Sequence, residues 1–135
     1  MDIHESIQQI VEAKEEFGAL FYERALSRYP KVQQYYQGFD LERQSLLLAN
    51  ALMIIERHAV EPTPATELYL QHLGTRHHDR HVTREVYGGW VAALLEAMQG
   101  FHDEDWTPAL EEQWRRAFDC AVEAMFHGYD HRVTV

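Results

Sequence analysis

The stretch that decides the fold is LGTRHHDRHV, residues Leu73 to Val82, which places three histidines within five residues. Just upstream, Leu70, Leu73 and His77 follow one another at steps of three and four, the spacing of one face of an α-helix. His77 therefore stands where an apolar stripe would otherwise continue. A histidine in that position can point from a helix into a hydrophobic pocket.

Turn-forming residues divide the rest of the chain into helices. Apolar residues recur at steps of three and four in nearly every long segment, and the alternation typical of β-strands is missing. Pro and Gly gather at a few points, which mark the turns. The sequence therefore predicts an all-α protein of six or seven helices, folded as one domain over residues 1–135, a length that suffices for a core of its own.

Capping signals predict the helix bounds. A first helical region is expected from about Ile3 to Tyr29, with Gly18 as the point where it could break, and a short helical piece is expected over residues 31–36. The first region ends before a proline, which pushes the preceding residue out of the helical conformation. The expected N-caps of four later helices are Asp40, Thr63, Thr83 and Thr107.

Charge and composition exclude several classes of partner. Asp plus Glu outnumber Lys plus Arg by 22 to 12, for a net charge of -10, so the molecule repels phosphate backbones and anionic lipids. We expect no nucleic-acid and no membrane binding. No signal segment or long apolar run is evident, which favours a cytoplasmic protein. The one cysteine, Cys120, is expected in the core because it lies among apolar residues.

Four interpretations of the histidine cluster stay open on the residues alone. His78 and Arg80 fit solvated positions at a helix C-terminus, where cations are favoured. His77 and His81, four residues apart, could bind zinc from one helix face, although no third and fourth ligand is evident. Acid–base catalysis would require a nucleophile, and no nucleophile motif is present. In the fourth interpretation, His77 ligates a haem iron in an apolar pocket.

The residues from Leu73 onward carry a family resemblance. Leu73, His77, Val82 and Tyr87 stand at the spacing of a leucine four places before a histidine, an apolar residue five places after it and a tyrosine ten places after it. This pattern resembles the proximal region of bacterial single-domain globins and of the globin domain of flavohaemoglobins. The resemblance covers nearly the whole chain. It implies a globin fold that holds haem b, with His77 as the iron ligand and the other three residues as pocket wall.

Two upstream stretches, FGALFYERALSRYPKVQQYY and RQSLLLANAL, resemble the second and the distal helices of the same family. The resemblance makes Tyr36 the aromatic that stacks on the haem and Leu48 an apolar wall. It places Tyr22 and Gln44 on the ligand side, where a hydrogen-bond donor stabilises dioxygen. Two alternatives remain: Tyr22 as a core tyrosine bonded to the backbone, and Gln44 as a polar residue at a helix edge.

Three departures from the family pattern bear on the site. Tyr36 stands where phenylalanine is usual, so its hydroxyl needs a partner or water. A glycine is common at the position of His81, so the turn after the proximal helix is expected to differ. Tyr129 occupies the position of the glutamate that polarises the proximal histidine in flavohaemoglobins. That last departure implies a carrier-like rather than a peroxidase-like His77.

The resemblance implies binding of dioxygen and other diatomic ligands such as carbon monoxide and nitric oxide, with nitric oxide dioxygenation as an extension. Turnover would need a separate reductase, because the chain has no glycine-rich phosphate motif and no room for a flavin domain. A haem-based gas sensor read by a partner and a haem-free interaction module remain alternatives. The sequence is compatible with a monomer and with a homodimer.

Overall fold

A computed structural model describes residues 1–30, 34–36, 38 and 40–134 of the chain. The described residues form six α-helices and two short 3-10 helices, with no strand among them, so the all-α prediction is confirmed. The helices are α1 (Ile3–Glu12), α2 (Lys14–Arg28), η1 (Gln34–Tyr36), α4 (Leu41–Val60), α5 (Pro64–Asp79), α6 (Val86–His102), η2 (Asp103–Asp105) and α7 (Pro108–Asp130). Within these described ranges, none of the helices combines the length and the apolarity that a membrane span requires.

Side-chain caps set the start of three of the long helices. Asp40 accepts hydrogen bonds from backbone amides in the first turn of α4, and Thr63 and Thr107 do the same for α5 and α7, each followed by a proline at the first helical position. These three predicted caps are confirmed. Thr83 is not the cap of α6: the helix begins at Val86, and the carbonyl of Thr83 accepts the Val86 amide within a turn.

The N-terminal helical region breaks at Ala13 and not at Gly18. Ala13 has φ -122° and ψ 42°, outside the helical range, and it separates α1 from α2. Gly18 lies inside α2 at its crossing with α4, where an added Cβ would stand 2.7 Å from the Cβ of Ser45. Of the short helical piece expected next, residues 34–36 form η1, and residues 31–33 lie outside the described residues.

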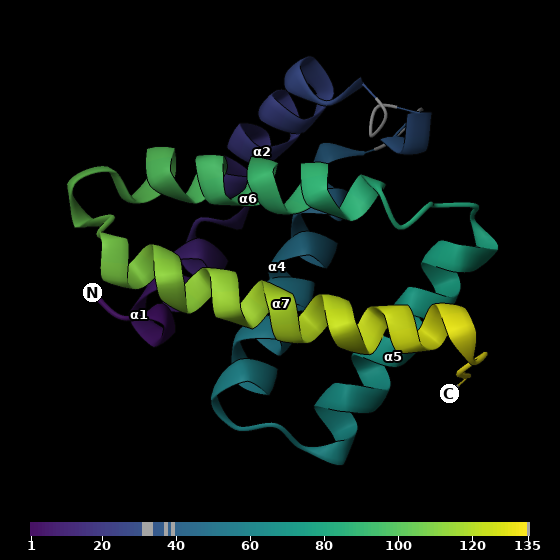
Figure 1. Ribbon diagram of the computed structural model, residues 1–135. Coiled ribbons are helices and arrows are strands. Elements are labelled where there is room, and N and C mark those ends of the chain that lie inside the picture. Colours follow the sequence, from purple (N-terminus) through teal and green to yellow (C-terminus); the bar gives the residue numbers. More distant parts are fainter. Residues whose placement is uncertain (31–33, 37, 39, 135) are drawn as a thin grey trace.

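The helix that carries His77 crosses α7 at close range (Figure 1). A Cβ on Gly74 of α5 would lie 1.9 Å from the carbonyl oxygen of Met125, and one on Gly128 of α7 would lie 1.9 Å from that of Gln71. Any larger residue at either glycine would force the two backbones apart. The pair of glycines therefore fixes where α5 lies against α7.

The apolar stripe of α7 forms a large part of the core. Its members Trp114, Phe118, Ala121 and Met125, which follow one another at steps of four, three and four, are all buried. Cys120, which the sequence placed in the core, is exposed. It directly precedes Ala121 and, at about 100° per residue, falls on the outer side of the helix.

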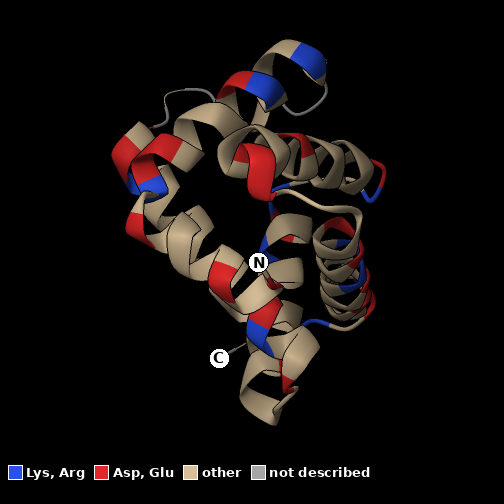
Figure 2. Ribbon diagram, turned by 90° about the vertical axis from the view of Figure 1, so that its left-hand side faces the viewer, with Lys and Arg blue, Asp and Glu red and all other residues tan. Residues whose placement is uncertain are grey.

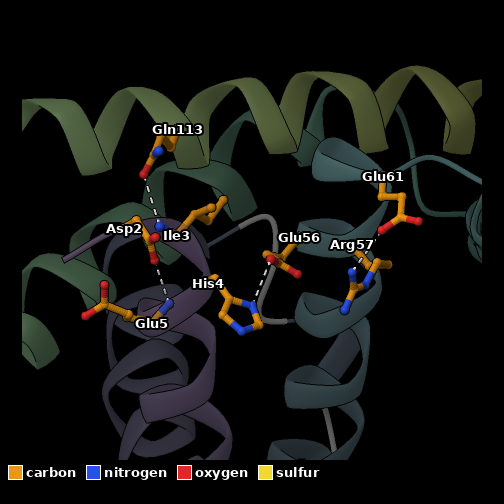
Figure 3. A network of polar contacts seen from close by, with 8 residues as sticks. All are labelled: Asp2, Ile3, His4, Glu5, Glu56, Arg57, Glu61 and Gln113. Carbon is orange, nitrogen blue, oxygen red and sulfur yellow. Dashed lines mark hydrogen bonds and ion pairs between the residues drawn. The ribbon is translucent and has the colours of Figure 1, made fainter.

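Polar contacts fasten α1 to two other helices (Figure 3). The amide of Ile3 donates to Gln113 Oε1 of α7 at 3.0 Å. His4 Nδ1 lies 3.5 Å from Glu56 Oε1 of α4. The first helix thus closes one end of the bundle.

The residues after α7 are hydrogen-bonded to α5. The Val133 amide donates to Thr75 Oγ1 at 3.0 Å, and His72 Nδ1 donates to the Val133 carbonyl at 2.9 Å. Arg132 donates to Asp79 at 2.7 Å. The helix that carries His77 is therefore held both by its close crossing with α7 at Gly74 and Gly128 and by this C-terminal segment.

Candidate functional site

A cavity of about 560 Å³ lies between α2, α4, α5, α6 and α7. Most of its walls are aliphatic or aromatic, and His77 is the one histidine among the described lining residues. The apolar lining residues are Phe21, Leu47, Leu48, Ala51, Ile55, Leu73, Trp90, Val91, Leu94, Phe118, Val122 and Met125. A largely apolar cavity of this size with a few polar groups is typical of a small-molecule or cofactor site.

Six of the eight residues predicted for the site line this cavity: His77, Tyr22, Gln44, Leu48, Leu73 and Tyr87. Val82 does not. Its side chain is buried beneath the turn between α5 and α6 and is absent from the described lining, so the structure does not support a wall contact. The side chain of Tyr36 lies outside the described part of the chain.

His77 is held by Tyr87. Its Nδ1 lies 2.7 Å from the Tyr87 hydroxyl, which leaves Nε2, on the other side of the ring, without a part in that bond. Burial, together with the smaller effect of the positive charges of Arg80 and Arg76, lowers the pKa of His77 to about 4. His77 is therefore neutral at pH 7, the form in which an imidazole nitrogen can ligate a metal.

Tyr129 lies next to Tyr87, with the two rings 5.9 Å apart. The Tyr129 hydroxyl donates to the Val82 carbonyl at 2.6 Å. Burial raises the pKa of Tyr87, and the neighbouring Tyr129 raises it further. The proximal side of the cavity is therefore supported by neutral hydroxyl groups.

Tyr22 and Gln44 line the cavity from α2 and α4. Tyr22 is buried, and its hydroxyl donates to the Gln44 backbone carbonyl at 3.2 Å. This contact is the one expected of a core tyrosine bonded to the backbone, while its place in the lining keeps the side chain beside the cavity. A ligand contact by Tyr22 or by the half-buried Gln44 stays a prediction.

Three arginines, Arg43, Arg76 and Arg80, also line the cavity. Within the described part of the chain, none of them forms an ion pair with a carboxylate. The indole Nε1 of Trp90 is buried there without a hydrogen-bond partner among the described groups. In a molecule of net charge -10, whose acidic residues recur along its helices (Figure 2), the three arginines form a local cationic rim, and the indole N–H is a neutral hydrogen-bond donor. Such a rim accepts the carboxylates of a ligand.

The turn after α5 changes the interpretation of the histidine cluster. His81 lies beyond the end of the helix with φ 64°, the left-handed backbone conformation that glycine favours. His77 and His81 therefore do not share a helix face. The described residues contain no group of three or more His, Cys, Asp or Glu side chains that could hold a metal ion.

Trp90 was missed by the sequence reasoning. Its ring lies 5.2 Å from that of His77 and 5.3 Å from that of Tyr87. The signal was present, because Trp90 follows Tyr87 by three residues on the same helix and precedes Leu94 by four. Arg43 was missed as well, since nothing in its local sequence distinguishes it from a solvated residue.

The family model described as Globin matches residues 19–125, well over half of the chain. The chain belongs to the globin family. The matched segment runs from α2 into α7 and contains all eight predicted site residues. A search of curated proteins finds no match.

The cavity of this globin fits haem, the group that globins typically bind, on three counts. Its walls are mostly apolar, as a planar macrocycle requires. His77 is neutral and hydrogen-bonded through Nδ1, so its Nε2 is left to act as the iron ligand. Arg43, Arg76, Arg80 and the unpartnered N–H of Trp90 would hold the two propionates.

Proposed function

We propose that this globin holds haem b through His77 and binds dioxygen and other diatomic ligands on the side of Tyr22 and Gln44. The observation that carries the proposal is the anchored, neutral His77 in the wall of a largely apolar cavity of about 560 Å³. When bound, haem supplies an iron that coordinates diatomic gases.

Three of the chain's own residues would orient His77, exclude water and donate a hydrogen bond to the ligand. Tyr87 orients the His77 ring through the bond of 2.7 Å to Nδ1. Leu48, in the cavity wall, excludes bulk water from the ligand side. The Tyr22 hydroxyl, which donates to a carbonyl in this structure, is close enough to the cavity to donate instead to a partly negative ligand.

Nitric oxide dioxygenation is a weaker extension of the same proposal. It depends on a donor such as Tyr22 that retains dioxygen while nitric oxide arrives. It also needs a separate reductase as the electron donor. Turnover should therefore appear only when the globin, nitric oxide, dioxygen and a reductase are combined.

The visible absorption spectrum of the purified protein tests the proposal. We expect an intense Soret band that shifts on addition of dithionite and again with carbon monoxide. A featureless spectrum that persists after haemin is added would refute the proposal and favour the haem-free interaction module. A haem spectrum that shows no change with carbon monoxide would refute the binding of diatomic ligands.

Substitutions identify the iron ligand. His77→Ala should abolish stable haem binding, whereas His78→Ala and His81→Ala should retain it because both side chains are exposed. Loss of haem in His78→Ala with retention in His77→Ala would contradict the assignment of the ligand.

A further inference from the structure

The exposed large hydrophobic side chains of the described part of the chain all belong to two helices, α4 and α5. They are Leu41, Leu46, Leu47, Met53, Val60 and Leu68. Leu47 lines the cavity, so the site accounts for it. Leu46, Met53 and Val60 are 54%, 43% and 59% exposed, and the bundle does not cover them. A group of exposed apolar side chains of this kind marks an interaction surface.

Leu46, Met53 and Val60 form one stripe along α4. They follow one another at steps of seven residues, and each such step brings a side chain back to within about 20° of the same direction. The stripe extends over about 21 Å of helix. Ile55, which lines the cavity, lies about 160° from Leu46 to Val60 around the helix axis, measured at Met53. The stripe therefore points away from the cavity.

Polar side chains accompany the stripe on one flank. Arg43, Asn50, Arg57 and Glu61 are all exposed and lie about 40° to 80° from Met53 on the same side of the helix. Arg57 and Glu61 form an ion pair of 3.4 Å at the C-terminal end of α4 (Figure 3). Arg43, at the N-terminal end, has no carboxylate partner among the described residues. The flank therefore carries an unpaired base at one end and an acid at the other.

We propose that this stripe is the contact surface of a homodimer, in which α4 packs antiparallel against α4 of a second copy with the twofold axis at Met53. Such a contact places Leu46 against the partner's Val60. Position 43 then lies opposite position 63 of the partner, about 3 Å along the axis from the partner's Glu61, so Arg43 can pair with that carboxylate. Arg57 likewise comes to the partner's Asn50, whose amide oxygen accepts from a guanidinium.

The charges on the flank distinguish the antiparallel dimer from a parallel one. Parallel helices would bring Arg43, Arg57 and Glu61 each against its own copy, and like charges in contact are unfavourable. The antiparallel contact is satisfied by two copies and leaves no stripe for a third. One helix from each copy makes a small interface, and the net charge of -10 on each copy opposes association, so we expect a dissociation constant of about 10 to 100 µM. The contact does not depend on haem, because the stripe lies outside the cavity.

Sedimentation velocity of the full chain tests the proposal, from about 1 to about 200 µM protein at about 0.15 M salt, where the Debye length is about 8 Å. The wild type should change from monomer to dimer over this range. Met53→Lys places two like charges at the twofold axis and should weaken the dimer by about tenfold or more. Leu41→Lys is the matched control: this leucine is 41% exposed and on the same helix, but about 120° from the stripe, so its dimer should be unchanged. A wild type that stays monomeric, or an equal loss in both variants, would overturn the proposal.

Disulfide cross-linking tests the orientation, in a Cys120→Ser background because Cys120 is exposed. Met53→Cys should form a disulfide-linked dimer on oxidation. Leu46→Cys and Val60→Cys should cross-link when mixed and not alone, since two copies of either position are about 21 Å apart along the antiparallel pair, beyond the reach of a disulfide. Self-linkage of Leu46→Cys without linkage to Val60→Cys would indicate a parallel pair and overturn the proposal.

A charge exchange tests the register. Arg43→Glu and Glu61→Arg should each weaken the dimer by about 2- to 30-fold, the equivalent of two exposed ion pairs. The two changes together should restore it, because the pair is re-formed with its charges reversed. Arg43 also lines the cavity, so these variants are compared by their oligomeric state and not by haem binding. A double variant that dimerises no better than either single one would overturn the proposed pairing.

Discussion

Replacing Gly74 with alanine would drive a Cβ into the backbone of α7. The new atom would lie 1.9 Å from the Met125 carbonyl oxygen and 2.6 Å from its carbon, whereas ordinary contact begins at 3.4 Å. The two helices would have to separate by about 1.5 Å at their crossing. No side-chain rotation can relieve the overlap, because the atoms that it meets belong to the backbone.

The cost of Gly74→Ala follows from what that separation disrupts. Overpacking of a core typically costs about 1–3 kcal/mol, and an overlap against backbone belongs at the upper end or above it. We therefore expect a loss of about 3 kcal/mol in the free energy of unfolding. For a domain of this size that loss lowers the midpoint of thermal unfolding by about 10 °C.

Thermal unfolding followed by far-ultraviolet circular dichroism measures the effect, with Gly88→Ala as the matched control. A Cβ on Gly88 of α6 meets no heavy atom within 4 Å, so this substitution should only gain the helix preference of alanine, about 0.5–1 kcal/mol. Its midpoint should rise by a few degrees. A Gly74→Ala midpoint within about 2 °C of the wild type would refute the assignment of a steric role to this glycine.

Two further predictions concern the cavity. Because burial and the charges of Arg80 and Arg76 lower the pKa of His77 from 6.5 to about 4, the unfolded chain takes up a proton in this pH range and the folded chain does not. The apoprotein should therefore lose about 3 kcal/mol of stability between pH 7 and pH 4, with no further loss from His77 below pH 4. Urea titrations should show a smaller loss in His77→Gln, and an equal loss would exclude His77 as the cause. In the haem-loaded protein, Tyr22→Phe should raise the dioxygen off-rate more than tenfold in stopped-flow displacement by carbon monoxide, since a charge-assisted hydrogen bond of about 1.5–3 kcal/mol is lost. An unchanged off-rate would leave Tyr22 as a core residue bonded to the Gln44 carbonyl.

Most of the fold could be predicted because its signals are local. Each of the caps Asp40, Thr63 and Thr107 can be recognised from four neighbouring residues in the sequence, and the apolar residues of α7 recur at a fixed period. The predictions failed where the burial of a side chain depends on a single position in the sequence. Cys120 and Ala121 are neighbours in the chain, yet one is exposed and the other buried, because a step of one residue turns the helix by about 100°.

The site was predictable as far as its residues lie on helix faces with regular spacing. Val82 follows a turn, so its side chain and its carbonyl point in directions that spacing does not determine. The Tyr129 contact with Val82 spans 47 residues and exists because α5 and α7 cross at Gly74 and Gly128. No local pattern contains that crossing, so the contact between Tyr129 and Val82 can be recognised only in three dimensions.

Because the C-terminal segment is attached to α5, the end of the family similarity and the end of the folded unit are not the same residue. The segment similar to the globin family model ends at residue 125, but Tyr129, Arg132 and Val133 lie beyond it and bond to the helix of His77 or to the turn that follows it. A protein trimmed to the limits of that similarity would keep His77 and most of its cavity and lose the bonds that hold α5 in place. Expression limits and fusion points should therefore be chosen from the packing, with Val133 retained.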